Sequence, residues 1–461
     1  MLSRRDLIQS QQYLTLRQVR ALLAHRPDPL DWAGRHGGAT AFAGIMILVI
    51  ALAGAAVIGI IFPGGKTTWQ SCDTVIVERD TGATYVCDAT SKTLYPVANF
   101  SSAALIMGGS KSVRVAGASL NWSRGALLGL AGAPDELVSS KKYLTGAWSL
   151  CSLSRPGAAG RGGPATVILA GAQPAAGMPV GERGVLLAGS DGTRYLLWSG
   201  HRFPIREPGY VLPALGFAAQ DGVAVADAWL APIPLGATLG PIDVADRGTQ
   251  LPGFPHAKVG QLVKLPGADG TDRVYLVRRE GLQELTALQQ ALVRGAAVTQ
   301  PVTLTPAALA GAPIMAPMVL SGFAPPTQLP AFARPADGVV CAEMLGDTIT
   351  VTIDGELPAR AASVVARRAV GYGVPVADAV LVAPGHAVLA RSMASPGASG
   401  GPLVLITDLG VRHACASDDV PAMLGFSGTP VPLPAALLDR VEEGIALDPA
   451  RARSALAPNP R

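Results

Sequence analysis

The sequence of 461 residues has few charges: Asp, Glu, Lys and Arg together make up 15% of it, against about 25% in ordinary soluble domains. Its formal net charge is only +4. Proteins that bind nucleic acid usually carry a dense basic patch or stripe, and a mild excess of arginine does not provide one. We therefore expect no nucleic-acid partner.

Cysteines are also few, and their spacing excludes a common type of metal site. The five are Cys72, Cys87, Cys151, Cys341 and Cys415. They form no C-x-x-C pair and no cluster with histidine, so a zinc site is not expected. In an oxidising compartment an odd number leaves one thiol over. Cys72 and Cys87 flank one hairpin-like stretch and could close a short loop, whereas a bond from Cys151 to Cys341 would tie distant segments together.

Two catalytic motifs are approached but not completed. Residues 397–402 read GASGGP, close to the loop around a serine-protease nucleophile, with Ser399 in the nucleophile position. That chemistry needs a histidine base oriented by a carboxylate. Ala398 replaces the expected aspartate, and none of the candidate histidines has the expected sequence context; they are His201, His256 and His386. We interpret this stretch as a loop.

The second near-miss is a phosphate-binding loop at Gly65-Lys66-Thr67. That motif needs a glycine five residues before the Gly-Lys pair, and Ile60 occupies this position, with Gly59 one place off. A turn at the exit from a membrane helix explains the stretch better. His36-Gly37-Gly38 resembles a lipase oxyanion loop but has no partner serine motif. We expect no catalytic residue, no metal and no cofactor, with ATP hydrolysis kept as the alternative.

What the sequence does contain is one long uncharged run, Ala39 to Phe62. Twenty-four helical residues span about 36 Å, enough to cross a bilayer. We expect a transmembrane helix over 39–62. A cleavable signal peptide is the rival interpretation, but its apolar region would be shorter, and the small triplet Ala53-Gly54-Ala55 lies in the middle of the run.

The charges on either side of this run predict its orientation. Only Lys66 and Arg79 follow it closely, whereas six arginines precede it: Arg4, Arg5, Arg17, Arg20, Arg26 and Arg35. Positive charge stays on the cytoplasmic side. We therefore expect residues 1–38 in the cytoplasm, and residues from 63 onward outside the plasma membrane, in a single-pass protein.

Small residues on the predicted membrane helix favour close helix packing. Ala51, Ala55 and Gly59 are spaced four residues apart, the pattern that lets two membrane helices approach. Ordinary use of alanine and glycine explains the spacing about equally well. Before the span, residues 1–38 read as a basic amphipathic helix.

One face of that first helix is apolar. Leu16, Val19 and Leu23 share it, and the pattern stops before Pro27, which ends helices. Such a helix could lie on the membrane or dock on a partner protein.

A recurring unit predicts the fold of the large C-terminal part. Each copy has a turn with Asp or Thr beside Gly, a Tyr-centred strand, a second strand and a short helix that ends near Gly. The copies lie near 79–108, 188–217, 266–296 and 403–426. They are not adjacent, and β-rich segments separate them. We expect an α+β, β-rich extracytoplasmic domain over 63–447, with a central β core and about four peripheral β/α repeat units, followed by a loose tail over 448–461.

An ordered set of sequence stretches resembles the EccB family, a core membrane component of type VII (ESX) secretion systems. The set includes IVERDTGATYV, DGTRYLLWSGHRFPI, IPLGATLGPI and ALLDRVEEGIALDPARA. Together with others it covers nearly the whole chain, and residues 301–336 are the least diagnostic.

The resemblance implies a structural subunit that provides an outer-side scaffold for protein export from the plasma membrane. It implies partners of the EccC (an FtsK-like ATPase), EccD and EccE types, a mycosin protease, and self-association in a larger complex. It also implies docking of the N-terminal helix on these partners.

The family pattern includes a long-range disulfide at Cys151 and Cys341, whereas Cys72, Cys87 and Cys415 lie outside it. The family carries an ATPase label, so a nucleotide-hydrolysing subunit remains an alternative function. A module that binds cell-wall polymer is a further alternative.

The expected orientation predicts the outcome of labelling in intact cells. A membrane-impermeant thiol reagent should reach a cysteine placed near Gly267 but not one placed near Gln18, because only the first lies outside the membrane. Labelling in the reverse pattern would overturn the orientation.

Overall fold

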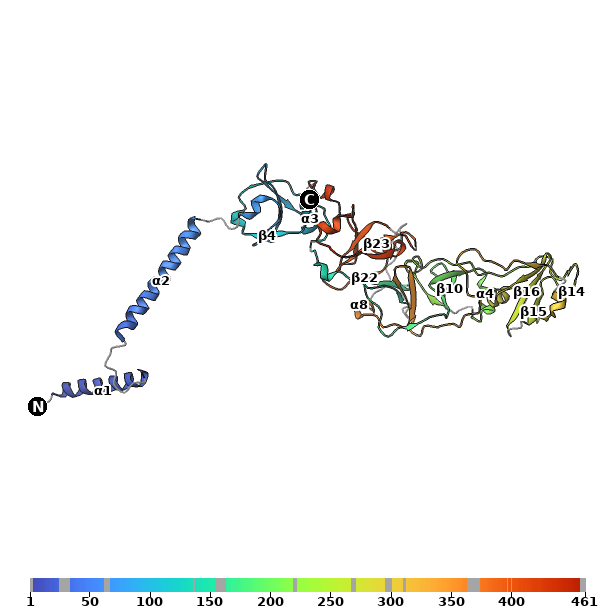
Figure 1. The fold of residues 1–461 in the computed structure, drawn as a ribbon, viewed down its shortest axis with the longest axis horizontal. Coiled ribbons are helices and arrows are strands. Elements are labelled where there is room, and N and C mark those ends of the chain that lie inside the picture. The colour runs from blue at the N-terminus through green and yellow to red at the C-terminus, as the bar shows by residue number, and fades with distance from the viewer. Residues whose placement is uncertain are drawn as a thin grey trace. The chain divides into compact units, whose positions relative to one another are not determined.

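The structure is a computed structural model, and it describes residues 3–24, 34–61, 67–135, 137–153, 163–218, 222–266, 271–294, 301–309, 312–362, 374–395, 397–398 and 400–456. Figure 1 draws the fold. The chain divides into two units. The first consists of residues 1–70 with 115–121, and the second, the large unit, consists of residues 71–114 with 122–461. Each is described by itself.

The first unit contains two long helices, α1 (Arg4–Ala24) and α2 (Gly34–Ile61). Within α2, residues 38–55 have a mean hydropathy of 2.2 and none of them is buried. By length and composition this helix can cross a membrane. It begins at Gly34, earlier than the expected start at residue 39, and Phe62 lies outside the described residues. Two short 3₁₀ helices follow, η1 (Thr68–Ser71) and η2 (Gly117–Ser119).

The large unit is built from β-sheets, and the first has the strand order β4-β1-β2-β3-β5. Its elements are β1 (Val75–Glu78), β2 (Thr84–Asp88), β3 (Thr93–Val97), α3 (Phe100–Met107), β4 (Ser112–Val115) and β5 (Ser123–Arg124). Three consecutive antiparallel strands form its middle. After α3 the chain returns to both outer edges, and β5 pairs in parallel with β3.

The second and third sheets are arranged in a similar way, as β11-β10-β9-β12 and β18-β15-β16-β17-β19. The second comprises β9 (Val185–Ala188), β10 (Arg194–Trp198), β11 (His201–Ile205), α4 (Pro208–Ala214), β12 (Val223–Ala224) and α5 (Asp227–Leu230). The third comprises β15 (Leu262–Pro266), β16 (Asp272–Arg278), β17 (Gly281–Glu284), α6 (Ala287–Leu292), β18 (Val302–Thr303), α7 (Pro306–Leu309) and β19 (Ile314–Met315). A two-stranded ribbon, β13 (Gln250–Leu251) with β14 (Phe254–Lys258), precedes the third sheet.

A fourth sheet near the C-terminus has the order β26-β23-β24-β25-β27. It comprises β23 (Val388–Met393), β24 (Leu403–Ile406), β25 (Val411–Ala414), α9 (Val420–Met423), β26 (Val431–Pro434), α10 (Ala435–Leu438) and β27 (Glu442–Glu443). The helix α11 (Pro449–Ala452) follows it.

The remaining sheet has six strands in the order β22-β7-β6-β20-β21-β8. Its elements are η3 (Ser140–Lys142), β6 (Trp148–Leu153), β7 (Ala165–Leu169), β8 (Met178–Pro179), β20 (Val339–Leu345), β21 (Thr348–Ile353), α8 (Ala359–Ala362) and β22 (Ala379–Leu381), with η3 and α8 beside the strands. β6 is buried along its whole length. Because β6 and β20 are neighbours, most of the chain between them is an insertion that leaves and re-enters this sheet.

Local sequence explains the hairpins and helix ends. Gly82 and Gly192 adopt positive φ angles of 74° and 82° in the hairpin turns, a conformation that costs glycine little. Asn99 accepts a hydrogen bond from the Ser102 amide at the start of α3, and Gly108 ends that helix in the left-handed conformation.

Three sheets are closed by a short return segment of sequence Gly-x-x-Leu. The amide of its glycine donates to a carbonyl of the third strand at 2.8–2.9 Å: Gly125 to Leu94, Gly236 to Arg202, and Gly444 to Arg412. Three residues later a leucine amide does the same: Leu128 to Pro96, Leu239 to Pro204, and Leu447 to Ala414. In the third sheet β19 takes this place beside β17.

Glycine is required in these segments because a ring lies against the backbone. A Cβ at Gly125 would lie 2.4 Å from the Tyr95 ring, and one at Gly236 would lie 2.4 Å from the Phe203 ring. At Gly444 the nearest atom would be on the His413 ring, 2.5 Å away. Cβ atoms essentially never come this close to another heavy atom. Any residue other than glycine at these positions would therefore clash with the ring.

Shared cores join the sheets of the large unit. One cluster combines the six-stranded sheet with side chains of the second and fourth sheets, and includes Trp148, Trp229 and Val388. A second cluster joins the second sheet to the third, as with Phe203 and Leu276. A third cluster joins α3 to the fourth sheet. Because each sheet shares its buried surface with a neighbour, the sheets stabilise one another.

The C-terminal segment corrects one expectation. We expected a loose tail from Asp448, but the described part up to Leu456 is packed. Asp448 caps α11, and Ala452 is fully buried. The Leu456 amide donates to the Leu127 carbonyl at 2.9 Å. Pro449 begins this short helix, and residues 457–461 lie outside the described residues.

The packing of this segment predicts the effect of a substitution at Ala452. Ala452→Asp would bury a carboxylate without a partner, so the free energy of unfolding should fall by at least about 2 kcal/mol. Ser454→Asp, at an exposed position, is the matched control and should change it by less than about 0.5 kcal/mol. Thermal unfolding of the detergent-solubilised chain measures both. Equal stability of the two variants would show that the segment does not contribute.

Candidate functional sites

The two helices of the first unit carry the residues predicted to contact other proteins. Ala51 and Ala55 are exposed on α2, and Gly59 lies in the same helix. On α1 the predicted docking residues are exposed as well, with Leu16 at 50%, Val19 at 49% and Leu23 at 78%. The exposed residues of both helices are therefore available for contacts with other proteins.

The apolar surface of α1 is wider than the sequence pattern indicated. Leu7, Leu14 and Leu22 are 59%, 56% and 76% exposed. At 100° per residue they lie on a different face of the helix from Leu16 and Val19. A helix with apolar side chains over much of its circumference can contact more than one surface.

The structure places four of the five cysteines at disulfide distance. Cys151 on β6 and Cys341 on β20 are directly opposite each other in the sheet, with Cα atoms 4.0 Å apart. Both are buried, and 190 residues separate them in the sequence. The Cα atoms of Cys72 and Cys87 are 5.3 Å apart.

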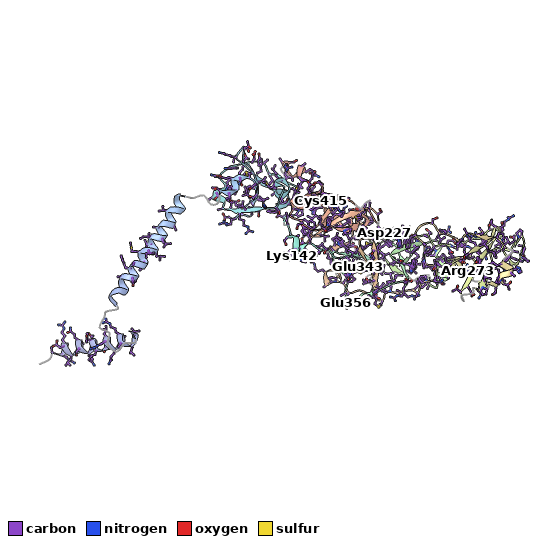
Figure 2. All side chains as sticks on the ribbon, in the orientation of Figure 1. Lys142, Asp227, Arg273, Glu343, Glu356 and Cys415 are labelled. Atoms are coloured by element: carbon purple, nitrogen blue, oxygen red, sulfur yellow. A yellow bond between two sulfur atoms is a disulfide. The ribbon has the colours of Figure 1, made fainter. Side chains whose placement is uncertain are left out.

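Cys415, labelled in Figure 2, is the free thiol. It lies in the core shared by α3 and the fourth sheet, and only 8% of it is exposed. Burial raises the pKa of this thiol to about 12. Because the thiolate is the reactive form, we expect Cys415 to react slowly in the folded protein.

The catalytic look-alikes gain no support from the described part of the chain. Ser399 and Lys66 lie outside the described residues. The His201 ring stacks on Phe323 with centroids 3.6 Å apart, and the Nδ1 atom of His386 lies 3.0 Å from the Pro384 carbonyl. These histidines belong to turns and ring stacks, and no group of three or more potential metal ligands occurs among the residues described.

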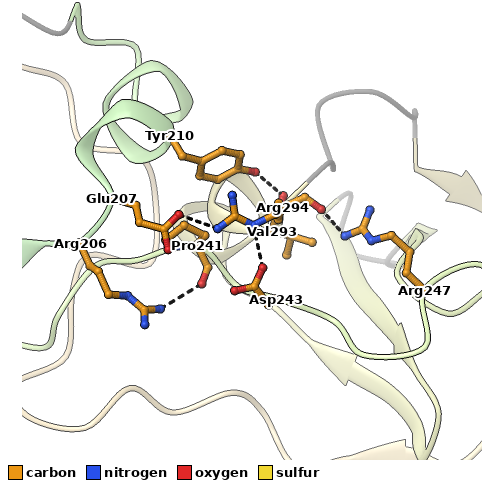
Figure 3. Close-up of polar contacts among 8 residues, drawn as sticks. All are labelled: Arg206, Glu207, Tyr210, Pro241, Asp243, Arg247, Val293 and Arg294. Carbon is orange, nitrogen blue, oxygen red and sulfur yellow. Dashed lines mark hydrogen bonds and ion pairs between the residues drawn. The ribbon is translucent and has the colours of Figure 1, made fainter.

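An ion cluster missed by the sequence analysis joins the second and third sheets (Figure 3). The Arg294 guanidinium, just after α6, donates to Glu207 and to Asp243, both at 2.7 Å. It also lies 4.9 Å from the centre of the Tyr210 ring. The Tyr210 hydroxyl donates to the Val293 carbonyl at 2.8 Å.

This cluster orients α4 relative to the end of α6, and it adds little to the free energy of unfolding. The two carboxylates raise the pKa of Arg294 above its usual range, with the Glu207 hydrogen bond as the largest cause. The three charged side chains are all substantially exposed, and exposed ion pairs contribute little free energy. Contact with two carboxylates and one ring nevertheless holds α4 against the end of α6. No local sequence signal could have found residues so far apart in the chain.

A cavity of about 230 Å³ lies between the β10–β11 turn and β21. Trp198 and Ile349 form part of its lining, and Arg183 is its one charged lining residue. The Arg183 guanidinium already donates to the Pro179 and Val180 carbonyls. The cavity therefore offers no arrangement of acid, base or nucleophile.

Comparison with known families decides what kind of protein carries these features. The family described as "Type VII secretion system ESX-1, transport TM domain B" (EccB) matches residues 1–458. The chain belongs to the EccB family. This confirms the resemblance identified in the sequence, and it places the apolar helix and the sheets within one family pattern that covers nearly the whole chain.

Individual EccB relatives are distant but similar over most of their length. The "ESX-3 secretion system ATPase EccB3" of Mycolicibacterium smegmatis is 29% identical over 474 residues, which cover 94% of this chain and 86% of the relative. The protein of the same name from Mycobacterium tuberculosis is 27% identical over 483 residues, with the same coverage. The word ATPase is part of the names of these relatives.

Solved EccB structures share the fold. The EccB3 dimer from the ESX-3 core complex is 27% identical, with a TM-score of 0.64, and covers 83% of this chain and 100% of that chain. A chain of the intact ESX-5 inner membrane complex has a TM-score of 0.66 at 24% identity, covering 100% of this chain and 97% of that chain. At this identity the second likeness concerns the fold alone.

The cysteine geometry predicts a pattern of reactivity. Without reductant, peptide mapping should recover a linked Cys151–Cys341 peptide, and Cys151→Ser should lower the free energy of unfolding by about 2–5 kcal/mol. Cys415 should resist alkylation at pH 8.5 until the protein is unfolded, because burial keeps it protonated. Two alkylatable thiols at Cys151 and Cys341 in the native protein would contradict the bond.

Proposed function

We propose that this chain is a structural subunit of a type VII secretion membrane complex and provides a scaffold for export on the outer side of the membrane. The observation that carries the proposal is the EccB family match over residues 1–458. Two features of the structure support it. One apolar helix can anchor the chain in a membrane, and shared cores join the sheets of the large unit.

The membrane helix is oriented with its N-terminus in the cytoplasm. The arginines before α2 and the near absence of basic residues just after it support this orientation. The large unit then lies on the periplasmic side, where the pairs Cys151–Cys341 and Cys72–Cys87 can form disulfides.

The large unit consists of four copies of one β/α unit around a β core. The shared strand order of four sheets supports this organisation. In each, three antiparallel strands are followed by a helix and by return segments at the edges, and three of the four end in Gly-x-x-Leu. The six-stranded sheet is the core, because it shares a hydrophobic cluster with the second and fourth sheets.

The first unit makes the contacts with other subunits. The exposed apolar side chains of α1, among them Leu16, Val19 and Leu23, dock on the cytoplasmic parts of EccC-, EccD- or EccE-type subunits. The small residues Ala51, Ala55 and Gly59 let α2 pack closely against another membrane helix. A mycosin protease is a further candidate partner outside the cytoplasm.

Direct assays distinguish the scaffold hypothesis from the two alternatives, an ATP-hydrolysing enzyme and a module that binds the cell wall. Intrinsic ATP hydrolysis would need Lys66, the lysine of the incomplete phosphate loop, so Lys66→Ala should leave export unchanged in a scaffold. Ser399→Ala tests the protease look-alike in the same way. Loss of export with loss of a robust ATPase rate in Lys66→Ala would favour the enzyme. Binding of the purified chain to peptidoglycan would favour the cell-wall module.

Replacement of the docking residues should detach the chain from its complex. Leu16→Glu combined with Leu23→Glu introduces charge into the apolar face of α1, so other subunits should no longer co-purify in mild detergent, as mass spectrometry can measure. The matched control is Gln11→Glu with Gln18→Glu, which adds the same charge at exposed polar positions away from the face of Leu16 and Leu23 and should keep the partners. Full co-purification of the leucine variant would contradict docking through this face.

A further inference from the structure

One buried arginine of the large unit has no bonded partner. Arg440 follows α10, and only 6% of the residue is exposed. The Nε atom of its guanidinium is buried and has no hydrogen-bond partner, and the side chain forms neither a hydrogen bond nor an ion pair with any residue that the structure describes. Because a charge removed from water without a bonded partner is costly, this arginine calls for an explanation.

The neighbouring arginine of the fourth sheet contrasts with it. Arg412 on β25 donates from Nε to the Val441 carbonyl at 3.1 Å and from a terminal nitrogen to Glu443 at 2.9 Å. Its hydrogen bonds therefore lie within the chain and support the fold. The same sheet thus holds one arginine that its own chain satisfies and one that it does not.

The charges near Arg440 do not offset its burial. Burial lowers the pKa of this guanidinium, Asp439 raises it, and the like charge of Arg412 lowers it again. The Asp439 side chain is 52% exposed, and it acts on Arg440 through space without a hydrogen bond. Since the net shift is downward, the chain by itself holds the charged form of Arg440 less favourably than water does.

An exposed leucine lies at the same end of this sheet. β25 and β27 pair in parallel, with Val411 beside Glu442. Leu409 and Arg440, each two residues earlier in the chain, therefore lie at the same end of the pair. Leu409 is 85% exposed in the turn between β24 and β25, and its apolar side chain is unusual at such a position.

Two exposed valines adjoin the same place. The Ala377 amide donates to the Arg440 carbonyl at 2.7 Å. Just before it in the chain, Val374 and Val376 are 61% and 42% exposed. A recessed arginine with exposed apolar side chains around it is typical of the contacts that contribute most to protein interfaces.

We propose that Arg440 is a docking point for a carboxylate side chain of another subunit of the complex, with apolar contacts from Leu409, Val374 and Val376 around it. A guanidinium binds a carboxylate through two parallel hydrogen bonds, and these bonds supply the partner that Arg440 lacks. The apolar side chains favour a protein segment, because a phosphate group alone would leave them exposed to water. This inference rests on the proposed scaffold function and names the chemistry of one of its contacts.

The first test places the same substitution at both arginines. Arg440→Met removes a buried charge without a partner in the chain, so the thermal unfolding temperature of the detergent-solubilised chain should stay unchanged or rise. Arg412→Met removes hydrogen bonds that the chain makes itself, so its unfolding temperature should fall. A similar fall in both variants, or a failure of Arg440→Met to fold, would make Arg440 a structural residue and overturn the proposal.

The second test measures assembly of the full-length chain in mild detergent, by quantitative mass spectrometry of the subunits that co-purify. With Arg440→Met, the retained amount of the contacting subunit should fall at least about tenfold, because its carboxylate loses the opposite charge. Leu409→Asp and Leu409→Lys form a matched pair that differs in the sign of the added charge. The aspartate should reduce retention by repelling the carboxylate, whereas the lysine should preserve it.

A carbodiimide identifies the group that faces Arg440. In the Arg440→Lys variant the reagent should join the lysine ε-amine to the other subunit's carboxylate as an amide, and the oxygen that leaves converts the reagent to a urea. Arg453→Lys is the matched control and should give no link to another subunit, because the Arg453 guanidinium donates to carbonyls of its own chain. A link to Asp439 alone would show that the chain neutralises its own cation, and it would overturn the proposal.

Full retention of every subunit by Arg440→Met would also overturn the proposal, as would equal effects of the two Leu409 variants. Loss of a co-purifying anionic lipid, with every subunit retained, would assign the position to a phosphate headgroup and equally overturn it. These results would leave the scaffold intact, since the wild-type chain still assembles. A wild-type chain that co-purifies with no other subunit would instead count against the scaffold itself.

Discussion

The pairing of β6 with β20 is the contact on which the large unit depends. These strands are neighbours in the six-stranded sheet although Cys151 and Cys341 lie 190 residues apart. Bringing such distant residues together costs chain entropy that the local structure cannot offset. Burial of β6 on both faces supplies part of the stabilisation, and a disulfide between Cys151 and Cys341 would restrict the unfolded chain further. The second and third sheets can then be inserted between two fixed strands.

A second constraint is the closure of sheet edges. Three antiparallel strands and one helix leave two edges with unpaired backbone groups, which would otherwise pair with other chains. Here the chain returns to each sheet and covers its edges with very short strands or, beside β11, with isolated backbone bridges. A few hydrogen bonds are enough to cover an edge, as the bonds donated by the Gly236 and Gly444 amides illustrate. The third sheet uses β19 beside β17 instead.

Prediction from the sequence succeeded where the signal is local. The apolar run identifies α2, and Asp-Gly turns identify hairpins such as the one at Gly192, because both depend on neighbouring residues. The return strands were missed since two paired residues leave no periodicity to detect. Arg294 was missed because its partners, Glu207 and Asp243, are distant in sequence. The packed segment after Asp448 was interpreted wrongly, because its stability comes from α3 and Leu127 rather than from its own composition.

The sequence contains two long stretches without charged side chains, and each can be explained by what surrounds it. Charge is absent from two long stretches, the membrane helix and residues 295–333. In the first, lipid is the surrounding medium, and a charge there would be costly. In the second, residues 312–333 are held to the second and third sheets by hydrogen bonds, and Met318, Leu320 and Phe332 pack against the core that these sheets share. The two uncharged stretches therefore have different physical reasons, because lipid surrounds the first and a protein core receives the apolar side chains of the second.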